Sequence, residues 1–325
     1  MKILLTGGAG FIGSHVADGY IKAGHEVVIL DNLSSGKWEN INPAAKFYLC
    51  DVRQKELMEK IFEKEKFDLV NHHAAQMSVP YSVEAPQEDA SINVLGLLNI
   101  LELSVKYKVK KIIFISSGGA IYGEAAEYPT TENYPPVPLS PYAITKFVSE
   151  QYLYYYHKQF GLNYTVLRYA NVYGPRQIPH GEAGVISIFM TRLIAGQRCT
   201  IFAYHDEPEG MKRDYVFVED VKEANVIALK KGLLGAFNIG TGIPTSTREL
   251  YDTVFSELKD KVKVSLKLKS PLNDKERPGD IRRSCLNVAK AEKVLGWKAK
   301  FYIKKGVNKT ALWQIKNGLV RPIVV

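Results

Sequence analysis

The sequence predicts an α/β protein built on a doubly wound parallel sheet. Three observations support this prediction: an apolar run at the start of the chain enters a glycine-rich turn, apolar strand candidates then alternate with amphipathic helical stretches, and polar residues follow the strands. This alternation is typical of parallel sheets with helices on both faces. Such sheets gather their ligands at the carboxyl ends of the strands.

The expected elements follow one another through the first half of the chain. Strands are expected at residues 2–5, 25–30, 47–50, 68–73, 111–116 and 164–169. Helices are expected from Phe11 onward and at residues 54–66, 90–107 and 141–160. Ser140 as a cap and Pro141 at the first helical position predict where the last of these helices begins.

The composition and the hydrophobic pattern of the sequence change after residue 170. Proline and glycine become common, strand candidates shorten and loops interrupt the alternation. We therefore expect a first domain at residues 1–170 and a smaller mixed α/β domain, which would bind the substrate, at residues 171–325. The stretch 236–239 is expected to return to the first sheet as a strand.

Composition and charge limit the partners of the protein. The 325 residues are 46% hydrophobic and 24% charged, and no apolar run approaches the roughly twenty residues that a membrane span needs. Met1 leads straight into the first strand, so a cytoplasmic protein is expected. The lysines behind the formal charge of +9 are spread along the chain, which favours a small anionic substrate over nucleic acid.

Cysteine and histidine spacing gives no sign of a metal site. Cys50, Cys199 and Cys285 are far apart and are expected to be buried, reduced thiols. His72 and His73 are adjacent, so a strand would direct them to opposite faces. No metal is expected.

The glycine-rich turn is the first candidate binding site. Gly7, Gly10 and Gly13 match the GxGxxG pattern with an extra residue in the turn, and the first two tolerate backbone angles closed to other residues. The helix that begins near Phe11 and Ile12 would present its N–H groups and positive end to a pyrophosphate. This predicts a dinucleotide site on a Rossmann-type sheet.

An acid at the end of the second strand identifies the dinucleotide. Asp31 stands where a carboxylate can hydrogen-bond the adenosine ribose and repel a 2′-phosphate, which favours NAD over NADP. Asp51 would either reach an adenine edge or cap the next helix. The small residues at 74 and 75 would either admit the cofactor or serve helix packing. The further candidate cofactor contacts are Asn32, Asp51, Val52, Ala74, Ala75 and Asn93.

Tyr142 and Lys146 are the candidates for catalysis. They are four residues apart on an expected helix and so project from one face. A neighbouring ammonium, together with the positive ring of NAD+, favours the phenolate of a group whose pKa is ordinarily about 10. Tyr142 is therefore expected to act as a general base near neutral pH.

Four segments of the chain carry a family resemblance. They are TGGAGFIGSH near the start, SSGGAIYG from Ser116, YAITK from Tyr142 and RYANVYGPR from Arg168. With them the chain resembles the extended short-chain dehydrogenase/reductases, and most closely the NAD-dependent UDP-hexose 4-epimerases. The resemblance extends over nearly the whole chain, to RPGD at residues 277–280.

The resemblance implies a mechanism. Tyr142 would take the proton of the sugar 4-hydroxyl while C4 gives hydride to bound NAD+. The 4-keto sugar would then turn about its link to the diphosphate, and hydride would return to its other face. Lys146 would bind the nicotinamide ribose and hold Tyr142 ionised, and a serine hydroxyl would steady the sugar oxygen.

The sequence departs from the family pattern at one catalytic position. The Ser or Thr of the family often stands five residues before the glycine of the YG pair, and that position here is Gly118. We expect a bulged strand end to bring the hydroxyl of Ser117 into its place.

The same segment disfavours related activities. Nucleotide-sugar 4,6-dehydratases resemble this chain but carry an Asp-Glu pair here, and UDP-glucuronate decarboxylases often carry a glutamate. Gly118, Gly119 and Ala120 offer no acid for such chemistry. Such a dehydratase or decarboxylase, and a non-catalytic NAD-sensing protein, are the alternatives to the epimerase.

The resemblance also implies the substrate contacts and the assembly. Asn171, Arg213 and Arg277 would bind the phosphates of a UDP-sugar, and Asp280 the uridine ribose. A bulky tyrosine near position 284 is associated with plain hexoses, so the small Ser284 favours UDP-N-acetylglucosamine alongside UDP-glucose. The helices at 95–107 and 147–160 would form the four-helix interface of a homodimer.

Overall fold

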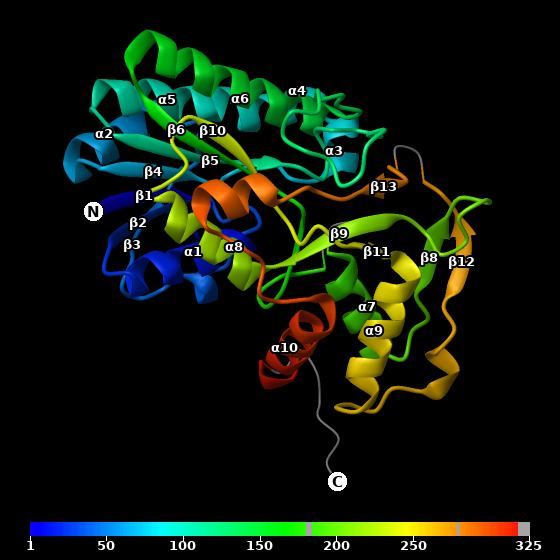
Figure 1. The fold of residues 1–325 in the computed structure, drawn as a ribbon. Helices are drawn as coiled ribbons and strands as arrows, with labels where there is room; N and C mark the ends of the chain where they lie inside the picture. Colours follow the sequence, from blue (N-terminus) through cyan, green and yellow to red (C-terminus); the bar gives the residue numbers. More distant parts are fainter. Residues whose placement is uncertain (180–183, 278–279, 318–325) are drawn as a thin grey trace.

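One large parallel sheet organises the molecule (Figure 1). The computed structural model describes residues 1–179, 184–277 and 280–317. The sheet consists of β1 (Lys2–Thr6), β2 (Glu26–Asp31), β3 (Lys46–Leu49), β4 (Leu69–His72), β5 (Lys111–Ser117), β6 (Asn163–Tyr169) and β10 (Gly235–Ile239). Their spatial order is β10-β6-β5-β4-β1-β2-β3, with every neighbouring pair parallel. The predicted α/β fold with a Rossmann-type sheet is confirmed.

Helices cover both faces of this sheet. On one face, α1 (Phe11–Lys22) and α8 (Val218–Ala228) share a core with Ile3 and Leu5. On the other, Leu4 packs in a core with α2 (Lys55–Glu65), α5 (Gly96–Lys106) and α6 (Pro141–Phe160). Successive strand residues point to opposite faces, so β1 contributes to both cores.

The helix α6 has the bounds that its sequence signals predict. Ser140 precedes it, and its hydroxyl accepts a hydrogen bond from the N–H of Ala143 at 3.2 Å. Pro141 occupies the first turn, where a missing N–H costs nothing. Gly161 ends the helix in the left-handed conformation, with φ of +70°.

The helix expected at residues 90–107 is present, but its first part, Ser91–Leu95, is π-helical. After α3 (Val79–Glu84), α4 (Pro86–Ala90) runs into a π-helical turn at Ser91–Leu95, and α5 begins only at Gly96. The Asn93 side chain in this wider turn accepts from Gln76 N at 2.9 Å and donates to Gln76 O at 3.1 Å. This paired bond ties the turn to the segment that follows β4.

The later part of the chain forms smaller sheets around a third core. One contains β7 (Asn171–Tyr173), β9 (Lys212–Phe217), β11 (Pro244–Ser246) and β13 (Arg283–Ser284), and another pairs β8 (Thr200–Ala203) with β12 (Leu272–Lys275). The helices α7 (Val185–Ile194), α9 (Thr247–Lys259) and α10 (Ile303–Lys316) surround that core, which includes Phe189, Phe217 and Tyr251. In the described ranges, no helix is long and apolar enough to cross a membrane.

Candidate active site

The glycine turn between β1 and α1 is shaped by close backbone contacts. Gly7 has φ of +67°, and a Cβ built there would lie 2.7 Å from Ala74 N. A Cβ at Gly13 would lie 2.1 Å from Gly7 O. Glycine is therefore required at both positions. The turn leaves the first N–H groups of α1, at Phe11 and Ile12, without partners inside the helix.

Asp31 joins the end of β2 to this turn. It is 7% exposed, and its carboxylate accepts hydrogen bonds from Ala9 N at 2.9 Å and Leu33 N at 2.8 Å. Burial raises the pKa of Asp31, and the two N–H groups oppose that rise. Each carboxylate oxygen has a further lone pair. The residue can therefore hold the turn and still accept a ribose hydroxyl.

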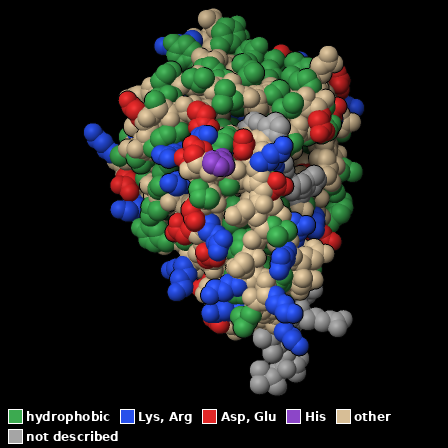
Figure 2. All heavy atoms as spheres, turned by 90° about the vertical axis from the view of Figure 1, so that its right-hand side faces the viewer, with side chains coloured by type: hydrophobic (Ala, Val, Ile, Leu, Met, Phe, Trp, Pro, Cys, Tyr) green, Lys and Arg blue, Asp and Glu red, His purple; other side chains and the backbone are tan. Residues whose placement is uncertain are grey.

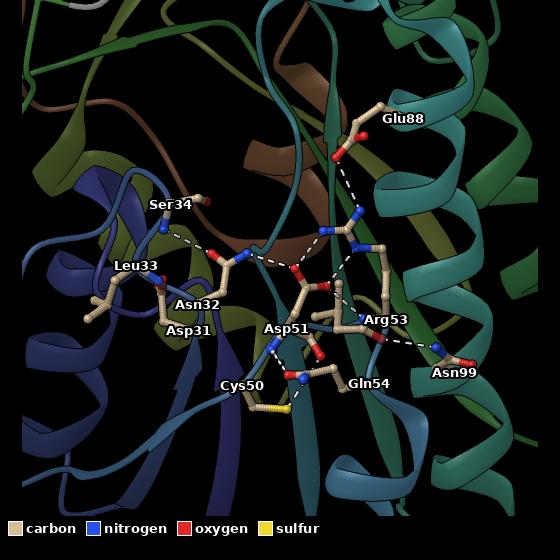
Figure 3. A network of polar contacts seen from close by, with 11 residues as sticks. Asp31, Asn32, Leu33, Ser34, Cys50, Asp51, Arg53, Gln54, Glu88 and Asn99 are labelled. Atoms are coloured by element: carbon tan, nitrogen blue, oxygen red, sulfur yellow. Dashed lines mark hydrogen bonds and ion pairs between the residues drawn. The ribbon is translucent and has the colours of Figure 1, made fainter.

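A polar network lies beside Asp31 at the ends of β2 and β3 (Figure 3). Asn32 donates to the Asp51 carboxylate at 2.8 Å, and the Arg53 guanidinium donates to both oxygens at 2.9 Å. The pKa of Asp51 falls to about 2, mainly because of Arg53. Arg53 also reaches Glu88 of α4 at 3.1 Å. Asp51 is therefore held ionised, in an ion pair with Arg53, where the adenine is expected.

The remaining cofactor candidates line the same edge of the sheet. Val52 is buried, and a Cβ on Gly96 would lie 2.6 Å from its Cγ2. Ala74 donates its N–H to Thr6 Oγ1 at 3.2 Å, and Ala75 follows it. Asn93 is 3% exposed, and its side chain is bonded within the protein to Gln76 and Asp89.

The three catalytic candidates come together at the end of β5. Tyr142 and Lys146 project from α6, and the Ser117 hydroxyl, on the last residue of β5, lies close enough to Tyr142 to lower its pKa. The Lys146 ammonium lies 5.8 Å from the centre of the Tyr142 ring and donates to Ile115 O at 3.0 Å. The structure thus brings one phenol, one hydroxyl and one ammonium into contact range.

Burial dominates the acid–base properties of this group. It raises the pKa of Tyr142 to about 12, while the Ser117 hydroxyl lowers it and the charge of Asp89 raises it. Burial lowers the pKa of Lys146 to about 8, which Asp89 and Glu150 oppose. The sequence analysis expects Lys146 and the positive ring of NAD+ together to lower the phenol pKa, and Lys146 does not lower it in this chain. The positive charge of the oxidised cofactor is the other group expected to lower the pKa of Tyr142.

The segment after β5 holds no acid. Gly118 and Gly119 follow Ser117 directly, and a Cβ on Gly119 would lie 3.1 Å from Asn171 Oδ1. Asn171 is the first residue of β7, so it stands at the same edge as the catalytic candidates. A group that could remove a proton from a sugar carbon is missing from residues 118–120.

The substrate candidates lie on the smaller sheets or in the loop between β12 and β13. Arg213 on β9 and Ser284 on β13 are partners in the strand register. The Arg277 guanidinium lies 4.8 Å from the Phe202 ring centre and forms an ion pair with Asp280 at 3.0 Å. Pro278 and Gly279 of the RPGD segment lie outside the described residues. In the described ranges, no cluster of His, Cys, Asp and Glu could hold a metal ion.

Three buried or networked residues near the site were missed by the sequence analysis. Arg53 lies two residues after Asp51, and Asp89 lies four residues before Asn93 in the same helical stretch. Glu150 repeats the spacing of four that joins Tyr142 to Lys146. That regular spacing is a signal that one helix face carries all three side chains.

Comparison with known proteins identifies the family. The model of the NAD dependent epimerase/dehydratase family matches residues 3–240. The chain belongs to this family. The matched range includes the glycine turn, Ser117, Tyr142 and Lys146, and the family resemblance inferred from the motifs is confirmed. The glycine turn, in which an added Cβ would fill the cradle, fits the NAD on which the family depends.

Solved structures of epimerases resemble the chain over almost its whole length. The UDP-glucose 4-epimerase of Thermotoga maritima with UDP-glucose is 46% identical, covers 98% of this chain and 99% of its own, and has a TM-score of 0.92. That of Thermus thermophilus with NAD is 43% identical, at 96% and 98% coverage and a TM-score of 0.88. The UDP-N-acetylglucosamine 4-epimerase of Methanobrevibacter ruminantium, in complex with UDP-N-acetylmuramic acid, is 33% identical, at 97% and 98% coverage and a TM-score of 0.88.

Proposed function

We propose that this protein is an NAD-dependent UDP-hexose 4-epimerase in which Tyr142 is the base. The observation that carries the proposal is the meeting of Tyr142, Ser117 and Lys146 beside a dinucleotide turn. The resemblance to epimerases solved with UDP-glucose and with NAD supports it. The acid-free segment at residues 118–120 disfavours a dehydratase or decarboxylase.

The side chains divide the chemistry between them. When bound, NAD would supply an oxidised, positively charged ring able to take up and return hydride. Tyr142 takes the proton of the 4-hydroxyl, holds it at the phenol oxygen and gives it back when the new alcohol forms. The Ser117 hydroxyl lowers the pKa of the phenol and so stabilises its anion. Lys146 places an ammonium beside both the phenol and the nicotinamide ribose.

The 4-keto sugar must rotate within the site while its nucleotide part stays bound. Arg213 and Arg277 would hold the diphosphate, with Asn171 beside it and Asp280 at the uridine ribose, because guanidinium forks suit phosphate oxygens. The keto sugar could then rotate about its diphosphate link and present its other face. The small Ser284 would leave room for a 2-acetamido group, so both UDP-glucose and UDP-N-acetylglucosamine are the proposed substrates.

The proposed cofactor contacts occupy the edge of the large sheet. They are Gly7, Gly10, Phe11, Ile12, Gly13, Asp31, Asn32, Asp51, Val52, Ala74, Ala75, Asn93 and Lys146. We divide the chain into a cofactor domain at residues 1–170 and a substrate domain at 171–325. A cytoplasmic location stays a prediction from the sequence.

We also propose a homodimer through α5 and α6. These helices pack side by side on the outside of the molecule, and Leu95, Tyr154 and Tyr155 are exposed there. A hollow lined by Val148, Gln151, Tyr152 and Tyr155 lies on the same face of α6. Figure 2 shows hydrophobic side chains gathered at the top of the molecule, where Figure 1 places α3 to α6. Two such faces would form a four-helix interface.

Incubation of the purified protein with UDP-glucose and, separately, with UDP-N-acetylglucosamine tests the proposed function. The mixtures are resolved by anion-exchange chromatography, and bound NAD is measured in the same preparation. We expect both sugars to be converted into their 4-epimers. Bound NAD without conversion of either sugar would instead indicate the NAD-sensing protein.

A further inference from the structure

A buried carboxylate outside the catalytic trio faces the catalytic helix. Asp89 on α4 is fully buried. Its oxygens accept hydrogen bonds from Gln76 Nε2 at 2.7 Å, Asn93 Nδ2 at 3.0 Å and Thr145 Oγ1 at 2.7 Å. All three donors are neutral, and no ion pair between described residues includes Asp89. A buried charge is costly unless another group compensates it.

Lys146 is the buried cation that Asp89 can compensate. Its ammonium donates to Ile115 O and lies 5.2 Å from the Phe114 ring centre. It also has no ion-pair partner among the described residues. The bond from Thr145 to Asp89 is made by the residue just before Lys146. The carboxylate therefore acts on this helix both through a hydrogen bond and through its charge.

The other groups around Lys146 are neutral or already paired. They are Tyr142 and Glu150 on α6, His72 at the end of β4, and His73 just after it. Burial lowers the pKa of each histidine to about 3, so both are neutral near pH 7. Glu150 is bonded to Arg168 at 3.0 and 2.6 Å. Of the two carboxyl groups that act on Lys146, Glu150 and Asp89, Asp89 is the one without a cation partner among the described residues.

We propose that Asp89 is a positioning residue for the catalytic pair. Through Thr145 it fixes the start of α6, and its charge keeps Lys146 in the ammonium form. This inference deepens the proposed function and rests on it. The charge of Asp89 also opposes ionisation of Tyr142. Removing that charge therefore lowers the pKa of Tyr142 as well as that of Lys146, so the acidic and the alkaline limb of a pH–rate profile both move to lower pH.

Asp89→Asn tests the charge while keeping the shape of the side chain. The new amide oxygen can accept from Gln76 and Asn93, and its NH2 can donate to Thr145 Oγ1, which itself donates to Tyr142 O at 3.0 Å. We expect both limbs of the kcat profile to move to lower pH by about one unit. The control Glu84→Gln removes an exposed acid from the neighbouring α3 and should leave both limbs in place. A lower rate with unmoved limbs would reduce Asp89 to a structural role and overturn the proposal.

Thr145→Val tests the hydrogen bond while keeping the charge. We expect kcat to fall about tenfold with the limbs unmoved, and Thr145→Ser to restore it. Bound NAD and the thermal unfolding midpoint are measured for every variant. An unchanged kcat in a folded, NAD-loaded Thr145→Val protein would contradict the positioning role.

A titration that needs no turnover separates this inference from the proposed function. NMR of isotopically labelled lysine Cε atoms follows the protonation of Lys146, whose signal Lys146→Met identifies. We expect the midpoint to fall by about one pH unit in Asp89→Asn. Absent epimerase activity with a moved midpoint would refute only the proposed function. An unmoved midpoint would refute the inference, whatever the activity.

Discussion

Leu286 explains why the hydroxyl that contacts Tyr142 comes from Ser117. A Cβ on Gly118 would lie 2.6 Å from Leu286 Cδ1 and 3.2 Å from Arg168 O. The backbone oxygen cannot move as a flexible side chain can. A serine at position 118 would thus require repacking of the core that contains Leu286. The hydroxyl that acts on the phenol is instead supplied by the preceding residue.

Ser117→Ala should lower kcat by about tenfold to a hundredfold, because the phenol loses the hydroxyl that favours its ionised form. Steady-state kinetics with UDP-glucose measures this loss. Ser116→Ala is the matched control, since Ser116 Oγ is buried and has no hydrogen-bond partner among the described residues. Equal effects of the two substitutions would contradict the role of Ser117.

Ser284→Tyr should reduce kcat/KM for UDP-N-acetylglucosamine by about tenfold or more, and that for UDP-glucose much less. Ser284 is 9% exposed and neighbours Arg213 in the strand register, so a large ring there would occupy space beside the proposed diphosphate site. Competition between the two sugars in one mixture gives the ratio of their kcat/KM values directly. An equal loss for both sugars would refute the proposed size limit.

At the scale of an element, one face of α6 carries both the catalytic candidates and a buried ion pair that holds the helix in place. Glu150 follows Tyr142 and Lys146 at the same spacing, and it forms a buried bidentate pair with Arg168 of β6. Arg168 also donates to the Tyr122 hydroxyl at 2.8 Å, which connects the helix to the segment after β5. This network fixes α6 relative to the strand end that carries Ser117.

Glu150→Gln should destabilise the fold by about 3–5 kcal/mol, because it leaves the Arg168 charge buried without a carboxylate. Urea unfolding measures the change. Asp252→Asn breaks the exposed pair with Arg248 on α9 and should cost less than about 0.5 kcal/mol. A similarly small cost at Glu150 would mean that the buried pair does not hold α6.

Local sequence signals such as capping residues predicted the regular helices better than the irregular turns within or between them. The cap at Ser140, the proline after it and the glycine at 161 fix α6 within the chain itself. The π-helical turn at Ser91–Leu95 depends on Asn93 bonding a segment seventeen residues away, which periodicity cannot reveal. The charge environment of Lys146 was missed for the same reason, since Asp89 reaches α6 only in the folded chain.

At the scale of the molecule, the sheet topology gathers the candidate residues. Parallel strands direct the glycine turn, Asp31, Asp51 and Ser117 to one edge. The βα alternation, which the sequence displays, predicts the parallel strands and the helices on both faces. The register that sets Ser284 beside Arg213 joins segments about seventy residues apart and could not be predicted from either one.

The proposed homodimer depends on the exposed faces of α5 and α6. Tyr155→Glu should convert the dimer into monomer, because a carboxylate on the exposed face of α6 would be buried between the two copies. Sedimentation velocity across protein concentrations measures the assembly. Tyr302→Glu, at an equally exposed tyrosine before α10, is the control. A monomeric unmodified protein would contradict the interface.

The turnover of Tyr142→Phe on UDP-glucose tests the central claim most directly. The variant keeps the ring and removes only the oxygen that would carry the proton. Bound NAD and the unfolding midpoint are measured on the same sample. We predict that kcat falls by about a thousandfold while both of these stay at their original values. Turnover close to that of the unmodified protein would contradict the claim that this phenol is the base.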